Sequence, residues 1–232
     1  MSARQVAAIV SAYYAEKFLQ GRIENLLEQT PVPLIVVVCQ EKSIEEEIAL
    51  RFSRPQDIQV ATTEDVPTVY AAWNIGIQFS KSQYVVSANS DDRFYAGGLR
   101  LLAKTLDKRP DYALVYADVD RVKEIDAEPF GRFEWAEGGL DELLKGCFIG
   151  PMPMWRRSLH DKYGVFDSAF TSAGDYEFWL RLAAGGEKFR KIHAACGAYL
   201  DCKDSLEHRS PVRSAWETAR ARALYRMEGV PA

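Results

Sequence analysis

The chain lacks the motifs that mark several large enzyme classes. It contains no G-x-x-x-x-G-K-[S/T] phosphate loop, and no G-x-G-x-x-G follows its first apolar run. P-loop chemistry and dinucleotide binding of the Rossmann type are therefore not expected. The G-x-S-x-G and H-E-x-x-H motifs are also missing, which argues against α/β-hydrolases and zincin-type metalloproteases.

Long apolar runs, a strong charge imbalance and paired cysteines are absent as well. No run of about 18 apolar residues occurs, so no transmembrane helix is expected. The start, MSARQVAAIVSAYY, has no secretory signal pattern. A net charge of −4 argues against non-specific nucleic-acid binding. The four cysteines form no C-x-x-C pair and are predicted to be reduced. We expect a cytoplasmic protein without a nucleic-acid partner.

One group of residues resembles a zinc-ligand set in composition only. His193, Cys196, Cys202 and His208 lie close together in the sequence, and these residue types bind zinc. Their spacing matches no standard zinc module, and Cys196 lies in an apolar, strand-like run. Core thiols and surface histidines are therefore the favoured interpretation.

What the chain does contain is a regular alternation of strands and helices over residues 1–120. Apolar runs typical of buried parallel strands alternate with helical patterns, and the connections are short. This pattern predicts an α/β fold with a mostly parallel sheet flanked by helices. The strands are expected at 5–14, 33–40, 57–62, 83–88 and 111–119.

The second half of the chain is less regular, and no linker separates two domains. A loop or hairpin is expected at 121–139, followed by short strands and helices. We therefore predict one domain over residues 1–209, with a regular half (1–120) and a less regular half (121–209), and a C-terminal helix at 210–232.

Two adjacent carboxylates end the fourth predicted strand, in the run VVSANSDDRF. In parallel sheets, ligands bind beyond the carboxyl ends of the strands, which is where Asn89, Asp91 and Asp92 are expected. Oxygen ligands of this kind suit Mg²⁺ or Mn²⁺. Asp175 and Glu177 open a later helix. The alternative is that Asp91 caps a turn or a helix and Asp92 is solvated.

Two blocks of sequence resemble family 2 glycosyltransferases, which have the GT-A fold. The first is TVYAAWNIGIQFSKSQYVVSANSDDRFYAGGL, which is similar to the family's Y-x-A-x-N-x-G-I helix followed by a strand ending in N-x-D-D. The second is LLKGCFIGPMPMWRRSLHDKYGVFDSAFTSAGDYEFWLRLAAGG, which is similar to the acceptor-side half. The resemblance covers residues 5–208 and implies sugar transfer from a nucleoside-diphosphate sugar. It also implies that residues 1–120 form the nucleotide-sugar-binding half and residues 121–209 the acceptor-side half.

The resemblance also implies roles for individual residues. Asp175 stands where the family has its catalytic base. A base at this position implies direct displacement, with inversion at the anomeric carbon. Mn²⁺ or Mg²⁺ would be held by Asp91 and Asp92, with His208 as a further ligand. UDP is the default nucleotide, and the acceptor is a saccharide or a lipid-linked saccharide. The predicted donor-binding residues are Ala12, Tyr14, Glu41, Asn74, Asn89, Asp91 and Asp92.

The chain departs from the family pattern in two places. QEKS, which includes Glu41, stands where the family usually has D-D-G-S, and Gly174 replaces the first member of an acidic pair before the base. These changes leave open a catalytically impaired protein that binds sugar nucleotides or a partner. A sugar-nucleotide nucleotidyltransferase is the second alternative, although SAYYAEKF is not a Gly-rich phosphate loop.

Several further side chains have two interpretations each. Arg156 and Arg157 suit phosphate binding or a cationic surface, and Trp155 and Trp179 suit sugar stacking or the core. The last helix has an apolar stripe that would pack on the domain, or else face a membrane surface or a second copy in a homodimer. The stripe consists of Val212, Trp216, Ala219, Ala223 and Met227.

Overall fold

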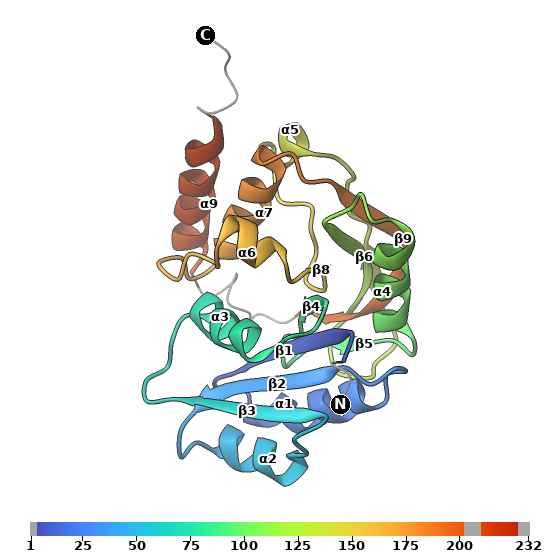
Figure 1. Ribbon diagram of the computed structural model, residues 1–232, viewed down its shortest axis with the longest axis vertical. Helices are drawn as coiled ribbons and strands as arrows, with labels where there is room; N and C mark the ends of the chain where they lie inside the picture. Colours follow the sequence, from blue (N-terminus) through green and yellow to red (C-terminus); the bar gives the residue numbers. More distant parts are fainter. Residues whose placement is uncertain (1–3, 202–209, 227–232) are drawn as a thin grey trace.

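The structure is a computed structural model, and it describes residues 4–201 and 210–226 (Figure 1). A single mixed sheet with the strand order β3-β2-β1-β4-β8-β6-β9-β5 runs through it, and β7 pairs with β6 outside this order. Helices flank the sheet, and the parallel ladders are the long ones. The predicted α/β architecture with a mostly parallel sheet is thus confirmed.

Four parallel strands form the N-terminal half, and the apolar runs of three of them, β1, β2 and β4, are buried on both faces. Short helices connect them, as expected for right-handed crossovers. The elements are β1 (Val6–Ala12), α1 (Glu16–Leu27), β2 (Leu34–Gln40), α2 (Ile44–Phe52), β3 (Ile58–Thr63), α3 (Val69–Phe79) and β4 (Tyr84–Ser87).

The remaining strands extend the sheet past β4 with mixed directions. β8 (Met154–Arg156) runs antiparallel to β4 and β6 (Leu114–Val122), whereas β9 (Phe189–Leu200) runs parallel to β6. The expected hairpin near 121–139 is present, because β7 (Gly131–Phe133) pairs antiparallel with β6. The helices here are α4 (Gly98–Lys108), α5 (Leu140–Leu143), α6 (Leu159–Tyr163), α7 (Gly174–Ala184) and α9 (Pro211–Arg226).

A two-residue strand that the sequence did not predict follows the acidic pair directly. β5 (Arg93–Phe94) pairs antiparallel with Gly197 and Ala198 of β9. Its partner is more than a hundred residues away in sequence, so no local pattern marks it. β5 thus connects the end of the N-x-D-D run to β9, at the edge of the sheet opposite β3.

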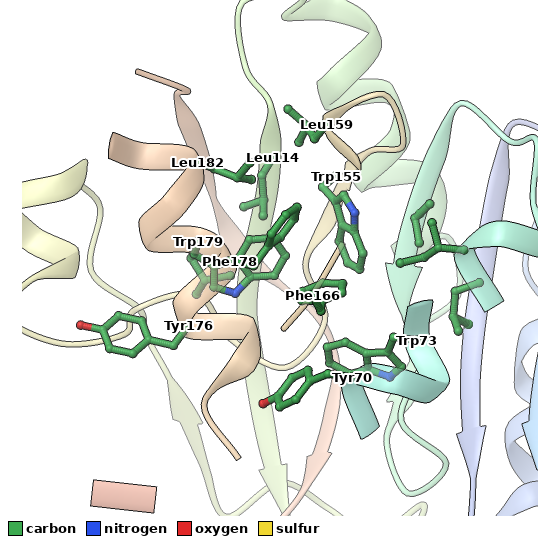
Figure 2. Close-up of a cluster of buried hydrophobic side chains, with 14 of the residues drawn as sticks. Tyr70, Trp73, Leu114, Trp155, Leu159, Phe166, Tyr176, Phe178, Trp179 and Leu182 are labelled. Atoms are coloured by element: carbon green, nitrogen blue, oxygen red, sulfur yellow. The ribbon is translucent and has the colours of Figure 1, made fainter. Parts of the chain in front are cut away.

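Aromatic side chains fill the core between α3, α7 and β8 (Figure 2). Phe166 lies at their centre, with its ring centroid 4.6 Å from that of Phe178 and 5.4 Å from that of Trp73. Trp155 and Trp179 are each 1% exposed, so the core interpretation is confirmed for both side chains. This cluster joins α3, from the first half of the chain, to α7, from the second.

The apolar stripe on the last helix does not pack on the domain, so that prediction is wrong. Val212 is 83% exposed and Trp216 is 61% exposed, whereas Glu217 and Ala221 on the opposite face are the buried residues of α9. Met227 lies outside the described residues. The reason is that Glu217 accepts several hydrogen bonds from the loop before α7, and these contacts fix which face points inward.

The described residues offer no support for zinc or for a membrane span. Cys196 is buried in β9 and His193 is exposed, while Cys202 and His208 lie outside the described residues. Within the described ranges, no group of three or more His, Cys, Asp or Glu side chains is arranged to hold a metal ion. Over the same ranges, no helix combines the length and the hydropathy that crossing a bilayer demands.

Candidate active site

A cavity of about 610 Å³ lies where the carboxyl end of β4 meets the start of α7. Asn89 follows β4, Asp175 is the second residue of α7, and Asp201 follows β9. The cavity therefore brings together side chains from both halves of the chain. Its walls also include Trp73, Arg121, Phe133, Trp135, Ser172 and Tyr199. Asp91 and Asp92 are not among the residues that line it.

Asp175 is held in the first turn of α7 by contacts on one oxygen. Its Oδ1 accepts hydrogen bonds from the backbone N–H of Tyr176 (2.8 Å) and from the hydroxyl of Tyr70 on α3 (2.9 Å). Burial, and then the charge of Asp175, raise the pKa of Tyr70 well above its usual value. Tyr70 therefore stays protonated and donates to the carboxylate.

The missing acid at position 174 has a structural explanation. A Cβ atom on Gly174 would lie 2.6 Å from Cδ2 of the Tyr70 ring, and Tyr70 is buried. Contacts of this kind force a shift of the ring or of the helix. The same tyrosine that donates to Asp175 therefore requires glycine beside it.

Restoring the family's acidic pair with Gly174→Asp is expected to destabilise the protein and to add no activity. Overpacking of a filled core lowers the free energy of unfolding by about 1–3 kcal/mol. Thermal unfolding checks this, and Gly139→Asp is the matched control, because a Cβ atom at Gly139 meets nothing within 4 Å. Equal unfolding temperatures for the two variants would contradict the steric explanation.

Glu217 on α9 holds the loop that leads into α7. Its carboxylate accepts hydrogen bonds from three consecutive backbone N–H groups, those of Thr171, Ser172 and Ala173, and from the two hydroxyls of this loop. Burial alone would raise the pKa of Glu217, but these hydrogen bonds outweigh burial and lower it to about 2. Glu217 therefore fixes the backbone two residues before Asp175.

The adjacent carboxylates Asp91 and Asp92 differ in environment. Asp92 is 1% exposed, and it accepts hydrogen bonds from the backbone N–H of Leu200 (3.2 Å) and from Asn89 Nδ2 (3.3 Å). Burial, and then the charge of Asp91, raise the pKa of Asp92. Asp92 therefore links the end of β4 to β9.

The positive charge opposite this pair is Arg22, which the sequence analysis missed. Arg22 is fully buried on α1, and its guanidinium lies 4.8 Å from the ring centroid of Phe94. Burial lowers the pKa of Arg22 to about 10, and the charges of Asp92 and Asp91 oppose this shift. A signal existed, because Arg22 is three residues after Leu19 and four before Leu26 and so lies on the buried stripe of the helix.

Asp91 is the acidic side chain that best fits a metal-ligand role. It is half-buried, and burial raises its pKa despite the nearby charges of Arg22 and Arg93. The charges of Arg22 and Arg93 lie near Asp91, but among the described residues neither forms an ion pair with it. A divalent cation would add to this positive charge. Asp92, by contrast, uses both oxygens inside the protein, and His208 lies outside the described residues.

The other predicted donor-binding residues have varied surroundings. Asn74 forms two hydrogen bonds with the backbone of Phe166, donating to its C=O (2.8 Å) and accepting from its N–H (3.0 Å). Glu41 pairs with Lys42 at the surface. Ala12 is buried at the end of β1, and Tyr14 is 83% exposed just beyond it. Asn74 thus has a structural role, and donor binding by these four residues stays a prediction.

The two arginines at the end of β8, Arg156 in the strand and Arg157 just after it, bind the protein's own backbone. Arg156 donates to the carbonyls of Leu106, Arg109 and Tyr112 at the end of α4 and just beyond it. Arg157 donates to the carbonyl of Ser80 (2.8 Å). Neither lines the cavity. Both side chains therefore satisfy the C-terminal ends of helices.

The sequence of this chain is similar to the sequences of sugar-transfer enzymes. Chondroitin synthase of Pasteurella multocida is 24% identical over 82% of this chain, although the chain spans only 20% of that protein's length. The glucosyltransferase WfgD of Escherichia coli, whose name gives a UDP-Glc donor and a GlcNAc-diphosphoundecaprenol acceptor, is 24% identical over 76% of this chain and 69% of its own length.

Solved structures support the same fold. TarS of S. aureus in complex with UDP-GlcNAc superposes with a TM-score of 0.76 at 17% identity, over 95% of this chain and 66% of that one. A mannosyltransferase of Pyrobaculum calidifontis in complex with GDP-Man and Mn²⁺ gives a TM-score of 0.73 at 16% identity, over 100% and 66%. The fold is therefore of the GT-A type. Since the family model for glycosyl transferase family 2 matches residues 7–166, this chain belongs to glycosyltransferase family 2.

Proposed function

We propose that this protein is an inverting glycosyltransferase that moves a sugar from a nucleoside-diphosphate donor to a saccharide or lipid-linked acceptor. The observation that carries the proposal is the cavity in which Asn89, at the end of β4, and Asp175, at the start of α7, face the same space. Family membership and the resemblance to nucleotide-sugar complexes support it.

The transfer is a single displacement at the anomeric carbon of the donor sugar. The acceptor hydroxyl oxygen forms the new bond as the bond to the diphosphate oxygen breaks, and the nucleoside diphosphate leaves. Asp175 takes the proton of the hydroxyl, since an alcohol is a poor nucleophile until this proton is removed. Tyr70 and the N-terminus of α7 keep the carboxylate in place.

The proposal includes a divalent cation at the acidic end of β4. Asp91 would hold Mn²⁺ or Mg²⁺, and Asn89, two residues before Asp91 in the sequence, lines the cavity. The cation would supply charge neutralisation for the departing diphosphate. We place Asp91 first and Asp92 second as ligands, because Asp92 is buried against Leu200.

Thermal unfolding with nucleotides tests the donor site. UDP, GDP and dTDP are each added with and without Mn²⁺, and one of them is expected to stabilise the protein when Mn²⁺ is present. At a hundred times the dissociation constant, binding adds about 2.7 kcal/mol to the free energy of unfolding, which raises the unfolding temperature by about 5–10 °C.

Asp91→Asn should abolish the part of this stabilisation that depends on Mn²⁺. The control is Asp161→Asn, because Asp161 is exposed on α6 and lies outside the cavity. No stabilisation by any nucleotide would overturn the proposal. Stabilisation without hydrolysis of the matching nucleotide sugar would instead indicate a protein that binds donors and does not transfer them.

A further inference from the structure

We propose that the wall of the cavity formed by β6, β7 and β9 is a subsite for an uncharged pyranose ring of the acceptor, with Trp135 as its platform. The inference rests on the proposed function and names the acceptor chemistry of the same cavity. It is carried by four features of the described residues: an aromatic wall, a buried ion pair behind it, a glycine that makes room for it, and the charges around it.

Three aromatic side chains form this wall. Phe133 and Trp135 are stacked, with ring centroids 5.0 Å apart and planes inclined by 29°, and Phe133 also contacts Tyr199 of β9 at 5.9 Å. All three line the cavity. Trp135 and Tyr199 are half-buried, as expected for aromatic side chains that leave part of their surface to a ligand. The apolar face of a pyranose ring is the complementary shape.

A buried ion pair fixes the backbone of Trp135. Asp118 on β6 and Lys191 on β9 are 5% and 7% exposed, and their charged atoms are 3.1 Å apart. Asp118 accepts a hydrogen bond from the N–H of Trp135 (3.1 Å), and Lys191 donates to its C=O (2.5 Å). A buried ion pair is weak evidence for stability. Both ends of this pair bind the backbone of Trp135, so its effect in this structure is to fix that backbone.

Gly150 makes room for the indole ring. A Cβ atom at this position would lie 2.4 Å from Nε1 of Trp135. Gly150 lines the same cavity, so a side chain here would displace the platform rather than fill empty space. The close approach of Gly150 therefore restricts the position of the Trp135 ring from a second side.

The charges in the cavity favour an uncharged ring. Arg121 is the cationic side chain among the described lining residues, and it is already paired with Asp201, Nη2 to Oδ2 at 2.5 Å. Its guanidinium is also covered by the ring of Phe133 at 4.6 Å. Asp201 is paired with both Arg121 and Lys123, so the carboxylate of Asp175 contributes the negative charge of the cavity. A uronate or a phosphate on the ring would meet this charge without a free basic partner on the described walls.

Saturation-transfer NMR with methyl glycosides tests the subsite without requiring activity. The probes are the methyl β-glycosides of glucose, galactose, N-acetylglucosamine and glucuronic acid and methyl α-mannoside, at millimolar concentration. At least one neutral glycoside is expected to bind, with signal strongest for protons on one ring face. Trp135→Ala should weaken binding about tenfold, and Trp135→Phe should retain most of it. Trp216→Ala is the matched tryptophan control, because Trp216 is exposed on α9.

Kinetics separate this inference from the proposed function. With an active enzyme, Trp135→Ala should raise the acceptor KM about tenfold, and the control Trp216→Ala should leave the acceptor KM unchanged. Glycoside binding that depends on Trp135 in a protein without transferase activity would sink the proposed function alone. Transfer with an unchanged acceptor KM in both Trp135 variants, binding of no glycoside, or tighter binding of the glucuronide would overturn the subsite.

Discussion

Replacing Asp175 with asparagine is expected to reduce sugar transfer by about a thousandfold while the fold and donor binding are retained. The amide has the size of the carboxylate and can still accept the hydrogen bonds from Tyr70 and from the N–H of Tyr176. It cannot take the proton of the acceptor hydroxyl. Release of nucleoside diphosphate measures the reaction, and the nucleotide-dependent rise in unfolding temperature measures donor binding.

Asp141→Asn is the matched control for this change. Asp141 also lies in the first turn of a helix, α5, but it is exposed and outside the cavity. The control should keep the full rate. If Asp175→Asn kept more than about a tenth of the rate, another group would have to be the base. Among the described residues that line the cavity, Asp201 is the other carboxylate.

The sequence predicted the elements of the N-terminal half because each strand there is a continuous apolar run and each helix has a periodic one. It also predicted that the N-x-D-D run ends a strand. It could not predict that Asp92 binds the backbone of Leu200, since that contact joins residues 108 apart in sequence. The same holds for β5, whose two residues carry no pattern of their own.

The buried charges were the residues hardest to predict. Apolar periodicity treats Arg22 as a break in a stripe and leaves Glu217 outside one, although both side chains point inward. Arg22 could have been found from its spacing to Leu19 and Leu26. On the last helix, the larger side chains Val212 and Trp216 indicated one face, and the contacts of Glu217 select the other. On this helix the hydrogen bonds of Glu217 outweighed the burial of the apolar stripe, because a buried carboxylate without partners costs several kcal/mol.

Glu217→Gln is expected to lower the free energy of unfolding by about 3 kcal/mol at neutral pH and to slow transfer. Glutamine has the shape of the protonated acid, and a pKa lowered from 4.5 to about 2 measures how strongly the fold prefers the carboxylate. The amide group would also point a donor at the N–H groups of Thr171, Ser172 and Ala173. Thermal unfolding should show a decrease of about 6–12 °C, and the rate should fall because Asp175 follows this loop.

The pH dependence of stability distinguishes the effect of the Glu217 charge from general packing of α9. Since the folded-state pKa of Glu217 is depressed, its contribution is fully present above about pH 5 and is lost as the pH falls toward 2. The stability difference between wild type and Glu217→Gln should therefore narrow over that range. Arg213→Ala is the control, because Arg213 pairs with Glu217 from an exposed position and should contribute less than about 1 kcal/mol. A difference that stayed constant down to pH 2, or an equal loss in Arg213→Ala, would mean that α9 does not act through the charge of Glu217.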